Sequence, residues 1–197
     1  MGRIKSAWEI ALERTENIVV DTEKLKYNDT VAKAKSITSL FINSEDKTFE
    51  DTLKSLNDLE DKKAMYEGVI TTSLQNINLP NGNEIDGRAL KAKQLIDFLS
   101  QNQPQVCDLT SQICTFLSQY PEHKKQLIEQ LKAQFEPERQ QKEAQLRAQY
   151  GEEINYTLEQ DQEFIQIANK NLEKLAGQYE QTLEGAKEKL RSFFKVN

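Results

Sequence analysis

Turn-forming residues are scarce in this chain, which has seven glycines and four prolines among 197 residues. β-Sandwiches and β-barrels need a tight turn between successive strands, and such turns depend on glycine and proline. The scarcity therefore argues against both architectures. Helices need few of these residues, so the composition predicts an all-α protein.

Long apolar runs are also missing. No stretch approaches the ~20 consecutive apolar residues that a membrane-spanning helix requires. The first residues lack the apolar centre of a secretory signal peptide. We therefore expect a cytoplasmic protein with no membrane span.

Residues that carry metal or catalytic chemistry are rare. The two cysteines, Cys107 and Cys114, would lie ~10 Å apart on a helix, too far for a disulfide or a shared metal. We expect the only histidine, His123, to face solvent, with a pH-sensitive contact as the alternative. One histidine and two distant cysteines cannot form a zinc site, and no glycine-rich phosphate loop is present. We predict no metal, no cofactor and no enzymatic activity.

Positive charge is neither in excess nor clustered. The chain has 26 Lys and Arg against 32 Asp and Glu, which gives a net charge of -6. Nucleic-acid backbones are bound by clustered Lys and Arg, whereas here basic and acidic residues are interspersed. The charge pattern therefore predicts no nucleic-acid partner.

The residues that remain describe an elongated helical molecule. A hydrophobic content of 37% is enough for one moderate core. The charged content of 29% and the mean hydropathy of -0.73 indicate that much of the surface stays in water. We predict an elongated helical bundle with an N-terminal helical lobe in residues 1–120. Residues 121–197 are expected to form a long C-terminal helical hairpin or coiled-coil-like region.

The first predicted helix covers residues 2–19 and is strongly amphipathic. Its apolar residues recur at the spacing of a half-buried helix. Three basic and three acidic residues cancel on its other face, whereas helices that lie on membranes are usually rich in Lys and Arg there. The pattern favours docking on protein. The apolar stripe consists of Ile4, Ala7, Trp8, Ala11, Leu12, Thr15, Ile18 and Val19.

Four more helices are expected before residue 121. They cover about 22–42 after an Asp21 cap, 48–74 after a Thr48 cap, 86–100 after an Asp86 cap, and 104–120 with Pro104 in the first turn. Asn81-Gly82 is suited to a tight turn, so a short hairpin near residues 77–86 is an open alternative.

The C-terminal region is rich in Gln, Glu, Lys and Leu. Pro121 is expected to begin a helix, and Pro137 to break or sharply kink it. Apolar residues between Tyr150 and Phe193 recur about every 3.6 residues. This spacing favours packing along helices of the same chain, or a short antiparallel pairing between subunits, over a long supercoil. If residues 138–194 form one continuous helix, it would extend ~85 Å.

Several residues interrupt this predicted helix. Asp161 occupies an apolar-stripe position. We expect it to mark the point where the helix leaves its neighbour; pairing with a basic residue or fixing the register are the alternatives. Gly151, Gly177 and Gly185 predict either close approach of another helix or bends.

Two segments resemble a known family. The opening GRIKSAWEIALERTE, residues 2–16, is similar to the start of an uncharacterised bacterial, spirochaete-type family of helical proteins. FEPERQQKEAQLRAQYG, residues 135–151, is similar to the same family over a shorter pattern. The resemblance implies a helical fold and no assigned activity. The Glu-, Gln- and Lys-rich C-terminal region also resembles peripheral-stalk subunits of rotary ATPases, in composition only.

The sequence thus predicts a non-enzymatic helical interaction or scaffold protein. A homodimer is the default if the apolar stripes exceed what one chain can cover. The alternative is a peripheral adaptor or stalk-like subunit that docks on a membrane-associated complex through its first helix. The residues expected to carry contacts are Ile4, Trp8 and Leu12 on the first helix, and Leu172, Leu175 and Tyr179 on the last.

Overall fold

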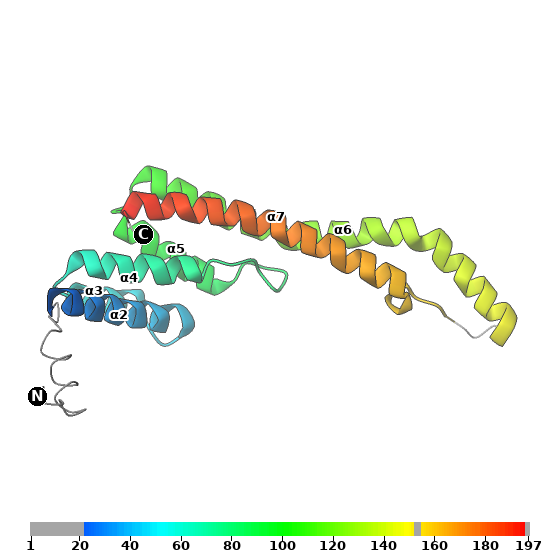
Figure 1. Cartoon of the computed structure of the whole chain (residues 1–197), viewed down its shortest axis with the longest axis horizontal. Helices are drawn as coiled ribbons and strands as arrows, with labels where there is room; N and C mark the ends of the chain where they lie inside the picture. The colour runs from blue at the N-terminus through cyan, green and yellow to red at the C-terminus, as the bar shows by residue number, and fades with distance from the viewer. Residues whose placement is uncertain (1–21, 152–154, 196–197) are drawn as a thin grey trace, which may run out of the picture.

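A computed structural model describes residues 22–151 and 155–195, and within these ranges it is helical and contains no strand. The all-α prediction is confirmed. Figure 1 shows a head formed by the earlier helices together with the near ends of α6 and α7, and an arm formed by the far ends of those two helices. The elements are α2 (Thr22–Asn43), α3 (Phe49–Asn57), α4 (Lys62–Gln75), α5 (Gly87–Leu99), α6 (Pro104–Tyr150), the 3-10 turn η1 (Leu158–Gln160) and α7 (Gln162–Phe194).

Side-chain hydrogen bonds cap the first turns of several helices. The Thr48 hydroxyl accepts a hydrogen bond from the Asp51 amide at 3.1 Å, and Asp86 accepts one from the Arg88 amide at 2.9 Å, as predicted. Pro104 lies in the first turn of α6, also as predicted. The predicted Asp21 cap and the whole first helix, residues 2–19, lie outside the described residues.

The predicted helix over residues 48–74 is in fact two helices. α3 ends at Asn57 and α4 starts at Lys62, because Asp61 caps α4 by accepting a hydrogen bond from the Ala64 amide at 3.0 Å. The break lets α4 pack along α2.

Residues 77–86 do not form the short hairpin that was an open alternative. This segment contains only bends and irregular backbone. Ile77 is buried in the head core, and Leu79 and Ile85 pack against that core. The segment is therefore anchored by its side chains, and Asn81 and Gly82 remain exposed between these anchors.

The head is built around one apolar core to which α2, α3, α4, α5, α6 and α7 all contribute. Helices α2 and α4 approach each other closely at Gly68. A Cβ placed on Gly68 would lie 2.6 Å from the Ala34 Cβ and 2.6 Å from the Val31 carbonyl oxygen. Only glycine lets the two helices come this close.

Helix α6 does not break at either internal proline. It runs from Pro104 to Tyr150 with Pro121 and Pro137 inside it. The predicted helix start at Pro121 is therefore wrong, and the predicted boundary between residues 120 and 121 falls inside α6. Of the two outcomes predicted for Pro137, a break or a sharp kink, the break is wrong. Each proline removes one backbone hydrogen bond, but packing of α6 against other elements continues on both sides of Pro121, at Tyr120 and Leu131. Figure 1 shows α6 bending in its yellow, C-terminal part.

Residues 138–194 do not form one continuous helix. α6 ends at Gly151, whose φ of 109° is accessible mainly to glycine, and α7 begins after Asp161. The chain reverses direction between these points, so α7 returns along α6 towards the head (Figure 1). Gly177 and Gly185 have open space where a Cβ would be, so the predicted close approach is wrong for both.

Candidate functional site

The arm has its own small core, separate from that of the head. We define the arm as the part of α6 from Leu127 onward, η1, and α7 up to Leu175. Figure 1 shows it as a pair of helices that projects from the head. The rings of Phe135 and Phe164 meet edge to face, with centroids 5.6 Å apart. The buried residues of this core are Leu131, Leu158, Phe164 and Ala168.

Asp161 joins the two helices of the arm. Its side chain is only 3% exposed, and its Oδ2 accepts a hydrogen bond from Lys142 Nζ at 2.5 Å. Its Oδ1 accepts from the backbone amides of Glu163 and Phe164 and so caps α7. The Lys142 hydrogen bond, with the backbone amides, lowers the pKa of Asp161 to about 2. The predicted role of Asp161, as the point where the helix leaves its neighbour, is therefore wrong; it pairs with a basic residue, which was the alternative.

A second charged cluster lies near the end of α6. The Arg139 guanidinium donates to Glu136 at 2.8 and 2.9 Å and also pairs with Glu143. It donates further to the Tyr156 carbonyl oxygen at 3.0 Å. The Arg139 hydrogen bond lowers the pKa of Glu136 to about 2. Arg139 thus ties α6 to the segment that leads into η1.

Aromatic contacts hold α7 against α6 where the arm meets the head. Tyr179 stacks on Phe116 with a centroid distance of 4.3 Å and lies 4.9 Å from the ring of Tyr120. Its hydroxyl forms a 2.6 Å hydrogen bond with His123 Nδ1. His123 is exposed, as expected, and also makes this contact. Burial raises the pKa of Tyr179.

The predicted contact residues have different environments. Ile4, Trp8 and Leu12 lie outside the described residues. Tyr179 is 6% exposed and packs inside the chain. Leu172 and Leu175 are half-buried, although they lie on the same helical stripe as the buried Ala168 and Tyr179. Contact of these residues with a partner stays a prediction.

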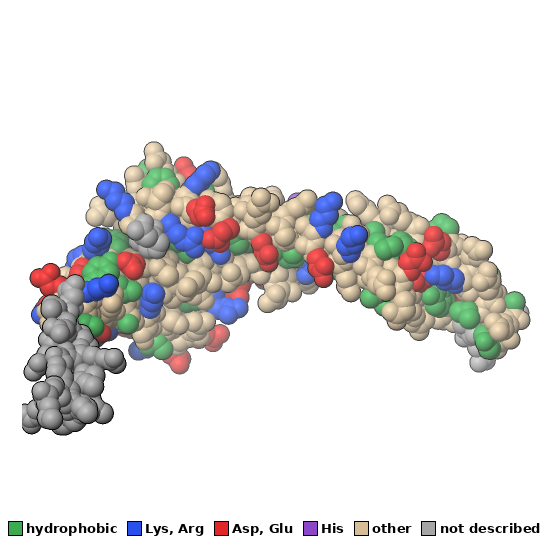
Figure 2. Space-filling view, viewed as in Figure 1, with side chains coloured by type: hydrophobic (Ala, Val, Ile, Leu, Met, Phe, Trp, Pro, Cys, Tyr) green, Lys and Arg blue, Asp and Glu red, His purple; other side chains and the backbone are tan. Residues whose placement is uncertain are grey.

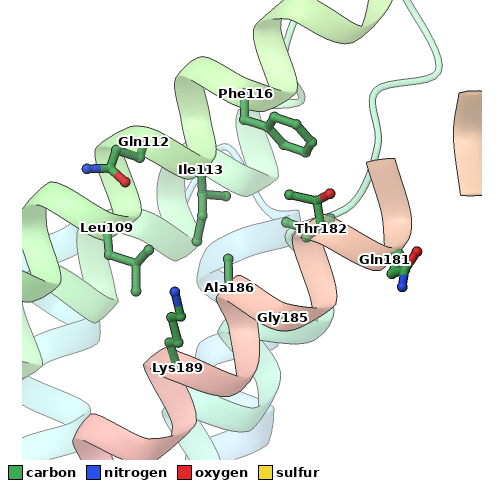
Figure 3. Close-up of a pocket in the computed structure, with 10 residues that line it drawn as sticks. Leu109, Gln112, Ile113, Phe116, Gln181, Thr182, Gly185, Ala186 and Lys189 are labelled. Atoms are coloured by element: carbon green, nitrogen blue, oxygen red, sulfur yellow. The ribbon is translucent and has the colours of Figure 1, made fainter. Parts of the chain in front are cut away.

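A groove lies between α6 and α7 that the sequence did not predict. It is a hollow of about 430 Å³. Figure 3 shows Leu109 and Ile113 on α6 pointing towards the α7 residues Ala186 and Lys189, and Phe116 pointing towards Thr182. A second hollow of about 420 Å³ is lined by α6 residues alone and shares Gln112 and Phe116 with the first. We call the first hollow the α6–α7 groove. Its only sequence signal is Gly185, a glycine inside a long predicted helix.

The surface itself shows mixed charge. On the face in Figure 2, acidic and basic side chains are interspersed along the molecule. Within residues 22–151 and 155–195, no group of three or more His, Cys, Asp or Glu side chains is arranged to hold a metal ion. In the same ranges, no helix has the length and apolar character to cross a bilayer.

Comparison with known families gives one match. The model of the family of unknown function DUF6657 matches residues 50–192. The chain belongs to this family. The searches of curated proteins and of solved structures returned no match. The DUF6657 match confirms that the chain belongs to an uncharacterised family. It contains residues 135–151, on which part of the predicted resemblance rested, and it begins after residues 2–16, on which the rest depended.

The DUF6657 match contains both walls of the α6–α7 groove and the whole arm. It leaves out α2, which nevertheless contributes Ala34, Phe41 and Ile42 to the head core. The match therefore covers the helices from α3 to α7, apart from the first residue of α3 and the last two residues of α7.

Proposed function

We propose that this DUF6657 protein is a non-enzymatic helical interaction or scaffold protein that associates through its arm, with a second copy of the chain as the partner. The arm consists of two helices and η1, and its apolar interior contains four buried residues. An element this thin covers its own apolar stripe incompletely, and an exposed apolar stripe favours association.

The half-burial of Leu172 and Leu175 is the observation on which the proposal depends. Ala168 and Tyr179, on either side along the stripe, are 6% exposed each. Between them, the two leucines keep part of their surface exposed. A second arm laid along this stripe would bury both, and a two-fold axis would make the contact reciprocal.

The ionisable groups of the arm favour a structural role over a catalytic one. Asp161 is engaged by Lys142 and two backbone amides, and Arg139 by Glu136, Glu143 and the Tyr156 carbonyl oxygen. Groups held in this way stabilise the ends of helices. The proposal retains the cytoplasmic localisation predicted from the sequence. The unpaired thiols of Cys107 and Cys114 are consistent with a reducing compartment.

Sedimentation velocity over a range of concentrations tests the proposal. We expect the full chain to form a dimer as its concentration rises. Leu172→Glu with Leu175→Glu places two charges in the proposed contact, and should weaken the dimer at least ~10-fold. The matched control is Gln166→Glu with Gln178→Glu, which adds the same charge at exposed positions of α7. Equal dimerisation of both double variants, or a monomer at all concentrations, contradicts the proposal.

A further inference from the structure

The α6–α7 groove has the size and the lining of a small-molecule site. Its volume of about 430 Å³ lies within the range of about 300–1,000 Å³ that is usual for such sites, whose walls are mainly apolar. Leu109 and Phe116 are half-buried along its α6 wall, with the buried Ile113 between them. On its α7 wall, a Cβ added at Gly185 would meet no atom within 4 Å. The described residues therefore leave room here for a ligand with an apolar body.

The charge at this groove is positive. Among the described residues, Lys189 is the only ionisable one in its lining. The Lys189 side chain is exposed and extends from α7 towards Leu109 on α6 (Figure 3). In the part of the chain that the structure describes, it takes part in no ion pair, since the nearby Glu184 pairs with Lys187 and Arg191. An unpaired ammonium beside an apolar wall favours a ligand that is both apolar and negatively charged.

The other polar side chains of the lining do not oppose a negative ligand. The Thr182 hydroxyl donates to the Gln178 carbonyl oxygen at 3.0 Å, within α7. Gln112 and Gln181 are exposed and uncharged, and Figure 3 shows Gln181 pointing away from α6. No carboxylate of the described residues lines the groove. The lining therefore attracts an anion and has no group that would hold a cation.

We infer that the α6–α7 groove binds a small amphiphilic anion, a free carboxylate with one short alkyl chain. The alkyl chain lies along Leu109, Ile113 and Phe116, and the carboxylate accepts a hydrogen bond from the Lys189 ammonium. The groove follows α6 for only about 10 Å, from Leu109 to Phe116, so it is too small for the two long chains of a membrane lipid. The groove lies outside the arm, so the inference is independent of the proposed association.

Isothermal titration calorimetry of the full chain with octanoate tests the inference. We expect one octanoate per chain, and at least ~10-fold weaker binding of 1-octanol, which has the same alkyl chain without the charge. Lys189→Gln should weaken octanoate binding at least ~10-fold, so that octanoate and octanol bind alike. The matched control is Lys170→Gln, which removes the same charge at an exposed position of α7 outside the groove and should leave binding unchanged.

A second pair of variants tests the location. Gly185→Leu places an apolar side chain in the groove at a position where the fold has room, and should abolish octanoate binding. Gly177→Leu is the matched control, since Gly177 is on the same helix, has the same open space and does not line the groove. Circular dichroism should show the same helical content in all variants.

Four results overturn the inference. They are no binding of octanoate, equal binding of octanoate and octanol to the unaltered chain, equal effects of the two members of either variant pair, and binding of octanoate only at concentrations where the chain is monomeric. The last result shows that a second copy covers the groove. Binding of the chain to phospholipid vesicles without binding of octanoate assigns the groove to a membrane surface and belongs with the first. A chain that is monomeric at all concentrations and binds octanoate contradicts the proposed function alone.

Discussion

The head and the arm are made of the same kind of helix but are stabilised in different ways. The head buries a continuous apolar core drawn from six helices, whereas the arm core has four buried apolar residues and is supported by caps and ion pairs around Asp161 and Arg139. Apolar burial depends little on pH, while paired carboxylates depend on it directly. We therefore expect the stability of the head to depend little on pH and the stability of the arm to depend on it.

The largest effect is expected in the head core. Leu95 has no exposed surface, so Leu95→Ala should lower the free energy of unfolding of the whole chain by about 2–5 kcal/mol. Leu131→Ala, in the smaller arm core, should cost less because that core is thinner and its neighbours can collapse into the gap. Urea denaturation followed by circular dichroism measures both. Equal losses would remove the distinction between head and arm.

Two glycines sharpen the comparison because their substitutions should have opposite signs. Gly68→Ala forces α2 and α4 apart and should destabilise the head by about 1–3 kcal/mol. Gly177→Ala, on the open side of α7, should add up to about 1 kcal/mol through better helix propensity. Thermal unfolding of the two variants checks this. A Gly68→Ala protein as stable as the unaltered chain contradicts the close packing described for α2 and α4.

Removing the cap of α7 should affect the arm alone. Asp161→Ala removes the acceptor for the Glu163 and Phe164 amides, which costs about 0.5–2 kcal/mol for a typical N-cap. Asp161→Asn retains a capping acceptor and loses only the charge pairing with Lys142, so its effect should be smaller. Hydrogen exchange of the amides in the first turns of α7 gives the measurement, with the α4 amides as the internal reference. Faster exchange in α4 would show that the arm and the head are not independent.

The smallest effect is expected from mild acid. The pKa values of Asp161 and Glu136 are lowered to about 2, from ordinary values near 4. Because each pKa is lower in the folded protein than in the unfolded chain, these carboxylates stabilise the arm above about pH 4. That contribution is lost as the pH falls from about 4 to about 2. NMR spectra recorded over this range should lose arm resonances before head resonances, and simultaneous loss would contradict the comparison.

Local signals in the sequence were sufficient for much of the fold. Thr48, Asp86 and Pro104 mark helix starts through their own chemistry, and the structure confirms all three. The apolar periodicity around Tyr179 likewise predicted a packed stripe. Such features depend on residues close in sequence, so a single chain reveals them.

The errors arose where distant residues decide the outcome. Asp161 fitted the helical period by position, but its pairing with Lys142 and its backbone contacts make it a cap. Pro137 predicted a break or a sharp kink, but α6 continues through it, and next to it Arg139 is held by the Tyr156 carbonyl oxygen, 17 residues further along the chain. The α6–α7 groove requires two helices that are separated by the turn of the arm, and no local pattern could show it.

The central claim is that the arm associates with a second copy along the stripe that contains Leu172 and Leu175. Hydrogen exchange of the full chain at a low and at a high protein concentration tests it directly. The account predicts slower exchange around these two residues at the high concentration, with the amides of α4 and α5 unchanged. Identical exchange of the arm at both concentrations would contradict it.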